Sequence, residues 1–265
     1  MKALRPKHFL AISFLLGLFP EIVFSAPAFD HRYPKWDGLL RSYVKEGLVD
    51  YASLKKSPQL LEDYLKTLKE VSRDEYDKWT RDQKIALWIN AYNAAVIELV
   101  VDNYPLQKGP GWKAFAYPKN SIQQIPKVWN RKALEMFGKK LSLNQIEHEI
   151  LRKEFREPRI HFALVCASLG CPVLRGEPYR GDALESQLTD QVRSFVTNSE
   201  KVRYDARTDT LFLSSIFRWF DEDFERAGGV LAFIRDNLPH KTADKISGQT
   251  KIDWLKYNWS LNERK

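Results

Sequence analysis

The segment from Arg81 to Asn103 places the strongest restriction on how this chain folds. Its apolar residues cover almost the whole circumference of a helix, and a helix of that kind is buried among other elements. Thr80 is expected to cap its start, and it must end before Pro105, because the residue before a proline disfavours helical geometry. The length of the chain, 265 residues, suits one sizeable domain with this helix at its centre.

Asn90 and Asn93 are the polar exceptions in this helix, three residues apart on one face. A buried amide without hydrogen-bond partners costs about 1–3 kcal/mol, so both side chains must find partners. One interpretation is that they tie the helix to the backbone of a neighbouring loop. The other is that they line a pocket together with Trp88 and Tyr92.

The periodicity of the remaining sequence predicts a helix-rich fold with few strands. Helices are predicted over 36–47, 58–71, 143–155, 184–196 and 229–237. Extended chain is predicted over 49–51 and 159–166, and a β-hairpin from 201–205 and 210–214. The fold class that follows is α+β, a helix-rich single domain around a small antiparallel sheet.

Two local signals refine these elements. Ser142 and Gln145 fit a capping box at the start of the helix 143–155. Residues 106–130 are rich in Gly, Pro, Lys and aromatic side chains, which predicts a long irregular segment of the kind that acts as a lid.

The first 28 residues have the pattern of a secretory signal peptide. Three basic residues precede an apolar run from Phe9 to Phe19, and small residues follow near the expected cleavage positions, after Ser25 or Ala28. The run has about eleven residues, whereas a helix needs roughly twenty to span a bilayer. Glu21 is atypical for such a leader, so an uncleaved anchor is the alternative.

Residues 29–265 are then expected to be a single exported domain, periplasmic or secreted, with no stable membrane span after processing. The net charge of the whole chain is +8. Residues 1–28 hold three basic residues and one acidic residue, which leaves about +6 for the remainder. The basic residues are scattered among acidic ones, which argues against nucleic-acid binding. The expected partner is a small molecule, a peptide or an envelope ligand, and no cofactor is implied.

Both cysteines of the chain, Cys166 and Cys171, lie in the block from Arg159 to Pro172, which also contains His161. In an exported protein a disulfide between them is the default, and its use would be to pin the turn 167–170. A free Cys166 acting as a nucleophile and two unreactive thiols are the alternatives. A metal site is not expected, because a tetrahedral site needs about four ligands and no second Cys/His pair has suitable spacing.

Four blocks of sequence resemble the signatures of the family known as domain of unknown function 547. These blocks are Trp88–Ala94, Ile146–Arg152, Arg159–Pro172 and Tyr257–Asn262. The resemblance covers residues 35–262 and implies little about function. It does imply a role for Cys166 itself, since the first cysteine position is usual in the family and the second often differs.

The family is also similar in outline to papain- and transglutaminase-like folds, in which a central helix packs on a small antiparallel sheet. This similarity implies that the central helix would supply a nucleophilic cysteine. Here that helix offers only Asn90 and Asn93. The protein is then either a relative that binds without cleaving or a variant whose nucleophile is Cys166.

A cysteine nucleophile needs a base within about 2.6–3.2 Å, held by a third group. His161 is five residues from Cys166, so a regular strand would place the two on opposite faces. His148 is the better base, although its neighbour Glu147 points about 100° away on a helix. The candidate catalytic residues are Cys166, His148, His161 and Glu147, with Asn90 or Asn93 as orienter or oxyanion donor; the candidate pocket residues are Asn90, Asn93, Tyr92, Trp88 and Ser168.

Three classes of function remain open. A thiol-dependent hydrolase or acyl/amide transferase requires a free Cys166 beside a histidine. A noncatalytic binding module would hold its ligand in a cleft rich in aromatic residues. These residues are Trp112, Trp129, Trp219, Trp254 and Trp259. A structural or redox-responsive exported protein requires the bridge from Cys166 to Cys171.

Overall fold

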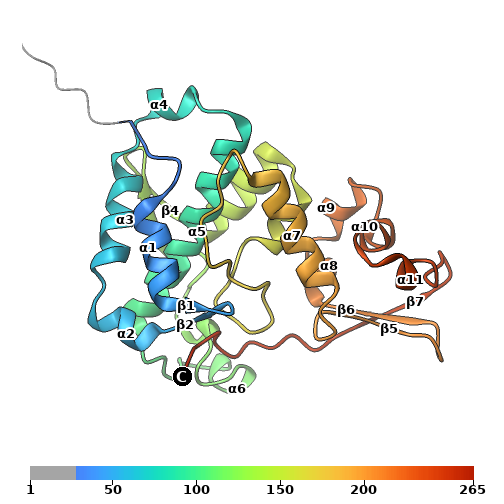
Figure 1. The fold of residues 1–265 in the computed structure, drawn as a ribbon. Coiled ribbons are helices and arrows are strands. Elements are labelled where there is room, and N and C mark those ends of the chain that lie inside the picture. The colour runs from blue at the N-terminus through green and yellow to red at the C-terminus, as the bar shows by residue number, and fades with distance from the viewer. Residues whose placement is uncertain (1–27) are drawn as a thin grey trace, which may run out of the picture.

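Helix α5 (Arg81–Asn103) runs through the middle of the computed structural model, which describes residues 28–265 (Figure 1). Its predicted start is confirmed, because the side chain of Thr80 accepts a hydrogen bond from the Gln83 backbone and the reciprocal bond of a capping box is present. Every residue from Ile85 to Ile97 is buried. By length and composition α5 could cross a membrane, but 89% of its most apolar stretch is buried inside the protein, as expected of a core helix.

The segments before α5 pack against it and against one another. They are α1 (Pro34–Tyr43), β1 (Val44–Lys45), β2 (Leu48–Val49), α2 (Tyr51–Lys56), α3 (Gln59–Glu70) and α4 (Arg73–Asp77). The two predicted helices correspond to α1 and α3. The predicted extended piece is shorter than expected, because the side chain of Asp50 accepts a hydrogen bond from the Ser53 backbone and so starts α2.

The segments that follow α5 contain little regular α-helix. They are α6 (Lys113–Ala116), the short 3₁₀ turn η1 (Ile122–Gln124), the hairpin β3 (Lys132–Met136) and β4 (Lys139–Ser142), the π-helix η2 (Gln145–Phe155) and the 3₁₀ turn η3 (Pro158–Phe162). The buried side chain of Gln124 organises the irregular segment, since its amide donates to three carbonyls of residues 113–118 and accepts from Gly109. Use of this segment as a lid stays a prediction.

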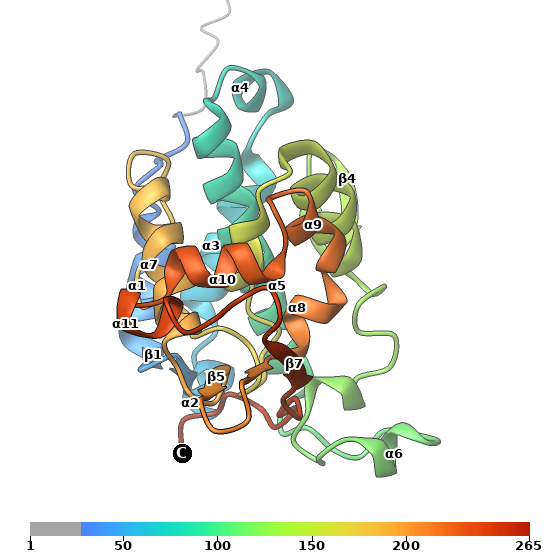
Figure 2. The same cartoon turned by 90° about the vertical axis from the view of Figure 1, so that its right-hand side faces the viewer.

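The C-terminal part adds a second hydrophobic core beside a three-stranded sheet. Its elements are α7 (Leu184–Val196), β5 (Val202–Asp205), β6 (Thr210–Leu213), α8 (Ser215–Trp219), α9 (Asp221–Glu225), α10 (Val230–Asn237), α11 (His240–Ala243) and β7 (Lys251–Trp254). The predicted hairpin is β5 and β6, and β7 joins β6 in parallel. The α+β class is confirmed, with α5 at the centre and the sheet toward one side, which Figure 2 turns to the viewer.

The strand predicted over 159–166 is wrong. Its first half is the turn η3, which begins after Glu157 accepts a hydrogen bond from the Arg159 backbone. Its second half is irregular chain whose backbone is satisfied by one side chain of α5. Asn93 donates to the carbonyl of Ala163 and accepts from the backbone amide of Val165. These hydrogen bonds take the place of a neighbouring strand.

Residues Tyr257–Asn262, here called the strap, return from β7 across the cysteine loop (Figure 1). Ser168 pairs with Leu261 as an antiparallel bridge. The backbone amides of Leu169 and Gly170 donate to carbonyls of the strap at 2.8 and 2.7 Å. The predicted signal peptide lies outside the described residues, apart from its last residue.

Candidate functional site

Cys166 and Cys171 form a disulfide, with the two sulfurs 2.18 Å apart. Neither is therefore a free thiol in this state. Their surroundings differ, because Cys171 is 3% exposed whereas Cys166 is only partly buried. Cys166 is thus the more accessible residue of the pair.

Two hydrogen-bond donors and one further hydroxyl surround the buried sulfur. The backbone amide of Cys166 and the hydroxyl of Tyr257 donate to Cys171 Sγ at 2.9 and 3.2 Å. The hydroxyl of Ser168 lies 3.3 Å from the same sulfur and donates to Tyr257. Donors at these positions stabilise negative charge on sulfur more than they stabilise a neutral disulfide. Cys171 is therefore placed to carry the charge of a thiolate.

The strap fits closely over the loop. A Cβ atom at Gly170 would lie 2.6–2.7 Å from the ring of Tyr257, so only glycine allows this approach. The carbonyl of Leu169 accepts a hydrogen bond from the ammonium group of Lys201, and burial lowers the pKa of that ammonium group to about 8. Leu169 itself is 43% exposed, so the loop has one face held by the protein and one face open.

Asn90 and Asn93 hold the backbone of loops, as in the first of the two interpretations. Asn90 donates to the carbonyl of Tyr179 and accepts from its backbone amide, at 2.7 and 3.0 Å. Asn93 donates to the carbonyl of Ala163 and accepts from the backbone amide of Val165, in the chain that leads to Cys166. Each amide therefore uses its oxygen and one of its two N–H groups to hold loop backbone. Trp88 is also a core residue, buried and donating to the hydroxyl of Tyr76.

The π-helix η2 carries Glu147, His148 and Arg152. Its hydrogen bonds join residues five apart, a rare geometry that is frequent at functional sites. The hydroxyl of Tyr92 donates to Glu147 at 3.1 Å. Burial raises the pKa of Glu147 to about 7, against the opposing effects of the Tyr92 hydrogen bond and of Arg152. Glu147 therefore exchanges a proton near neutral pH.

His148 is held by Arg152 and not by Cys166. One guanidinium nitrogen of Arg152 lies 2.9 Å from His148 Nδ1. Partial burial, together with the positive charge of Arg152, lowers the pKa of His148. The sequence-based set of Cys166 with His148 as its base is thus not brought together, and no histidine of residues 28–265 makes a hydrogen bond to Cys166.

His161 belongs to a buried charge cluster centred on Asp223. Its Nε2 lies 2.8 Å from a carboxylate oxygen of Asp223, which also accepts hydrogen bonds from Arg152 and Arg226. Burial alone would raise the pKa of Asp223, but the hydrogen bonds from His161 and Arg152 hold it well below its usual range. The ring of His161 stacks on Phe220 at 3.8 Å, and its Nδ1 is buried with no hydrogen-bond partner in the described chain.

Burial lowers the pKa of His161, whereas the hydrogen bond to Asp223 and its charge oppose this effect. In the neutral ring, a proton on Nε2 donates to Asp223 and leaves Nδ1 as an acceptor. Burial raises the pKa of the Tyr257 phenol, the hydrogen bond with Ser168 lowers it, and the negative charge of Glu147 raises it further.

Three of the five tryptophans expected to form a cleft meet beside the strap. Trp219 and Trp259 have ring centres 5.8 Å apart, and Tyr117 joins Trp259 to Trp112. Trp219 also contacts Tyr257 at 4.7 Å and is 42% exposed. Trp129 packs instead against the main core, and Trp254 lies under the guanidinium group of Arg218.

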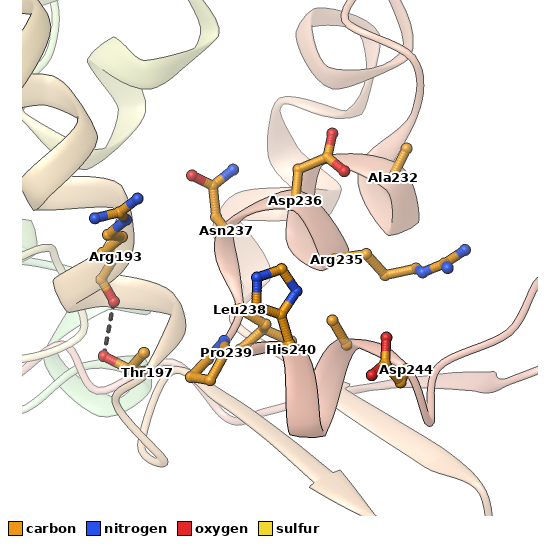
Figure 3. A pocket seen from close by; sticks show the side chains of 11 residues that line it. Arg193, Thr197, Ala232, Arg235, Asp236, Asn237, Leu238, Pro239, His240 and Asp244 are labelled. Atoms are coloured by element: carbon orange, nitrogen blue, oxygen red, sulfur yellow. Dashed lines mark hydrogen bonds between the residues drawn. The ribbon is translucent and has the colours of Figure 1, made fainter.

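A surface cavity of about 710 Å³ lies between α7, α10 and α11 (Figure 3). Arg193, Arg235 and His240 line it with acidic neighbours. None of the residues that line it is a cysteine or belongs to the cluster around Asp223. The cavity is therefore separate from the candidate site. Within residues 28–265 no group of three or more His, Cys, Asp or Glu side chains is arranged to hold a metal ion.

Sequence reasoning missed the importance of Tyr257 and Arg152. Both lie inside blocks that carry the family resemblance, and that was the available signal. Their roles depend on residues far away along the chain, since Arg152 reaches Asp223 and Tyr257 reaches Cys171.

Comparison with known proteins supports the expected family. Residues 76–196 match the family described as "Protein of unknown function, DUF547". The match includes α5, the π-helix η2, the disulfide loop and α7, whereas the strap lies outside it. No curated protein matches the chain, and no solved structure matches it. The similarity to papain- and transglutaminase-like folds is not shown.

Proposed function

We propose that this member of the DUF547 family is an exported protein whose Cys166–Cys171 disulfide exchanges with a thiol of another molecule. The observation that carries the proposal is the difference between the two sulfurs. Cys166 is the more accessible residue, and Cys171 is buried beside two hydrogen-bond donors. Exchange is fastest when the attacked sulfur is accessible and the leaving thiolate is stabilised.

The reaction consists of two displacements. A thiolate of the partner attacks Cys166 Sγ, the disulfide bond breaks, and its electron pair leaves on Cys171 Sγ. A second thiolate of the partner then attacks the partner's own sulfur in the mixed disulfide and releases Cys166 as a thiolate. The protein gains two electrons, and the partner leaves as a disulfide.

The surface around Cys166 suits a peptide or protein thiol. Leu169, Val173 and Trp219 are each more than 40% exposed. Leu169 lies inside the loop that the disulfide closes, and Val173 lies two residues after Cys171. Apolar contacts of this kind would hold the partner while its thiol reacts. The aromatic row beside the strap extends the same surface.

Export is part of the proposal. The N-terminal sequence has the order of basic, apolar and small residues that directs secretion. Disulfides persist in the periplasm or outside the cell, whereas cytosolic reductants remove them. Expression of the full chain in a bacterium, followed by separation of cytoplasm, periplasm and medium, tests the location. Recovery of the whole chain from the cytoplasm would reject export.

The exchange is tested with two single-cysteine variants. Cys171→Ser leaves the accessible Cys166, and Cys166→Ser leaves the buried Cys171. Each variant is treated with an aromatic disulfide, and formation of the mixed disulfide is followed by mass. We expect Cys166 to react about tenfold faster or more, because reactivity requires both thiolate character and access. Equal rates would contradict the assigned roles.

A direct test uses the wild-type protein. The oxidised protein is mixed with a dithiol under native conditions, and loss of the disulfide is compared with that of the unfolded chain. Exchange in the folded state supports the proposal. A disulfide that reacts only after unfolding would make it a structural bridge, as expected of a noncatalytic binding or structural module.

A thiol-dependent hydrolase or acyl/amide transferase is the second candidate. Glu147, with its pKa of about 7, and the buried His161 are the groups that favour it. It requires reduction of the disulfide first. Reduced wild type and Cys166→Ser are compared on an activated ester, and an acyl group found on Cys166 by mass spectrometry would favour this candidate over exchange.

A further inference from the structure

The backbone nitrogen of Phe29 donates to a carboxylate oxygen of Glu75 at 2.6 Å. Such a short contact is typical of hydrogen bonds in which one partner is charged. Glu75 lies in the first turn of α4, where the hydroxyl of Ser72 accepts from its backbone amide. The carboxylate is thus held in place by a capped helix turn and faces the first residues of the described chain.

Phe29 is anchored by its ring as well as by its backbone. The ring lies 5.2 Å from Trp79, 5.3 Å from Tyr33 and 5.5 Å from His31, between ring centres. Phe29 is partly buried, whereas Ala28 is exposed. In the described chain, burial therefore begins at Phe29.

The Ala28–Phe29 bond is one of the two expected cleavage positions. Ala26 and Ala28 supply small residues at the two positions that signal peptidases read. Cleavage after Ser25 would instead leave three residues before Phe29. The sequence alone does not choose between these positions, but the position of Glu75 does.

We infer that processing occurs after Ala28 and that the new α-ammonium group of Phe29 forms an ion pair with Glu75. This inference rests on the proposed export. Hydrolysis adds water to the Ala28–Phe29 bond, the carboxylate leaves with Ala28, and the amino group stays on Phe29 and takes up a proton. The nitrogen that donates to Glu75 keeps its place and gains a positive charge.

The surroundings favour this charge. A cavity of about 1100 Å³ adjoins the pair, and its walls include Asp30, Asp74 and Glu70. Lys35 and Lys78 also line it. Asp30 is paired with Arg32. Burial lowers the pKa of the nearby His31, although Glu75 and Asp30 favour its charged form.

The first test is the mass of the processed protein. The full chain is expressed in a secreting bacterium, and the protein from the exported fraction is analysed by intact mass and N-terminal sequencing. We expect Phe29 as the first residue. An exported protein that begins at Ala26, or elsewhere, would overturn the inference and leave export intact, whereas retention in the cytoplasm would reject export itself.

The second test measures the pKa of the α-amino group of Phe29. The α-amine of the processed protein is labelled by reductive ¹³C-methylation, and its pKa is followed by NMR in wild type, Glu75→Gln and Asp74→Asn. A carboxylate in contact raises the pKa of an amine by about one unit or more. We expect this rise in wild type, its loss in Glu75→Gln and little change in Asp74→Asn.

Asp74 is the matched control, because it carries the same charge one residue earlier in α4 without a hydrogen bond to Phe29. A similar pKa in wild type and in Glu75→Gln would show that no ion pair forms, even if the chain begins at Phe29. Neither test measures thiol exchange, so a failure of the exchange proposal would be detected separately.

Discussion

The hydroxyl of Tyr257 lies 3.2 Å from the sulfur of Cys171, although 86 residues separate them. The same hydroxyl lies 3.3 Å from Cys166 Sγ and accepts from Ser168 at 3.2 Å. One phenol therefore contacts both sulfurs of the disulfide. Its ring is fixed by Trp219 and Trp259, with centres 4.7 and 4.6 Å away.

Replacement of Tyr257 by Phe is expected to slow reduction of the disulfide by about tenfold. The ring keeps its packing, but the leaving thiolate of Cys171 loses a donor, and a hydrogen bond to a charged group contributes about 1.5–3 kcal/mol. The rate of reduction by a dithiol measures the effect. Tyr117→Phe, also beside Trp259, is the control, and equal slowing in both variants would contradict the role given to the hydroxyl.

Gly170→Ala is expected to displace the strap. The new Cβ would lie 2.6 Å from the ring of Tyr257, and such overpacking costs about 1–3 kcal/mol of stability. Hydrogen exchange of the Leu169 and Gly170 amides, which donate to the strap, should accelerate. Gly176→Ala meets no atom within 4 Å and should leave both exchange rates unchanged. Unchanged protection in Gly170→Ala would show that the loop does not depend on the strap.

Asn93→Ala should lower the free energy of unfolding by about 2–4 kcal/mol. The change leaves the carbonyl of Ala163 and the amide of Val165 buried without their partner, and each unsatisfied group costs about 1–3 kcal/mol. Urea unfolding measures the loss. The control is Asn103→Ala, at the partly exposed end of the same helix, which should cost less than about 1 kcal/mol. A similar loss in both variants would argue against the role of the two Asn93 hydrogen bonds.

Glu147 should make the folded state less stable as the pH rises from about 5 to about 7. Its pKa is raised from 4.5 to about 7 by burial, so the folded protein keeps a proton that the unfolded chain loses in this window. The contribution lost is at most about 3 kcal/mol, since one pKa unit corresponds to about 1.4 kcal/mol. Glu147→Gln does not titrate, so its stability relative to wild type should increase with pH.

The measurement is urea unfolding of Glu147→Gln, wild type and Glu149→Gln at several pH values. Glu149 is exposed on the same π-helix and should follow wild type. A difference between Glu147→Gln and wild type that does not vary with pH would mean that Glu147 is ionised in the folded protein at all of these values.

Asp223→Asn should remove about 3 kcal/mol of stability at pH 7, because it breaks a buried ion pair and leaves Arg152 without its carboxylate. The depressed pKa of Asp223 means that its contribution is complete above the unfolded value and is lost as the pH falls through the folded value. The difference from wild type should therefore shrink below about pH 4. Asp221→Asn, two residues earlier and exposed, is the control; an equal effect there would reject the cluster as the cause.

The sequence predicted α5 well because every signal for it is local. A continuous apolar segment, the capping box at Thr80 and the proline at 105 together set its limits. The hairpin of β5 and β6 was predicted for the same reason, since its strands are adjacent along the chain.

The strand over 159–166 was wrong because a distant side chain decides the local structure. Asn93 lies about 70 residues before the segment to which it is hydrogen-bonded, and the periodicity within that segment does not predict these hydrogen bonds. The π-helix was also not predicted from the sequence. A 3.6-residue period does not predict that Arg152, five residues after Glu147, affects the pKa of that carboxyl. The paired roles of Tyr257 and Cys171 depend on contacts that only the fold supplies.

The position of the strap has a consequence for how the protein matures. The cysteines leave the ribosome long before residues 257–262 do, and during that interval the loop lacks the hydroxyl of Tyr257 and the carbonyls that hold its amides. An oxidant that meets the nascent chain therefore meets two cysteines in an open loop. Once the strap has docked, Cys171 is buried and Cys166 is partly buried, so the bond is more accessible while the chain is being made than after it has folded.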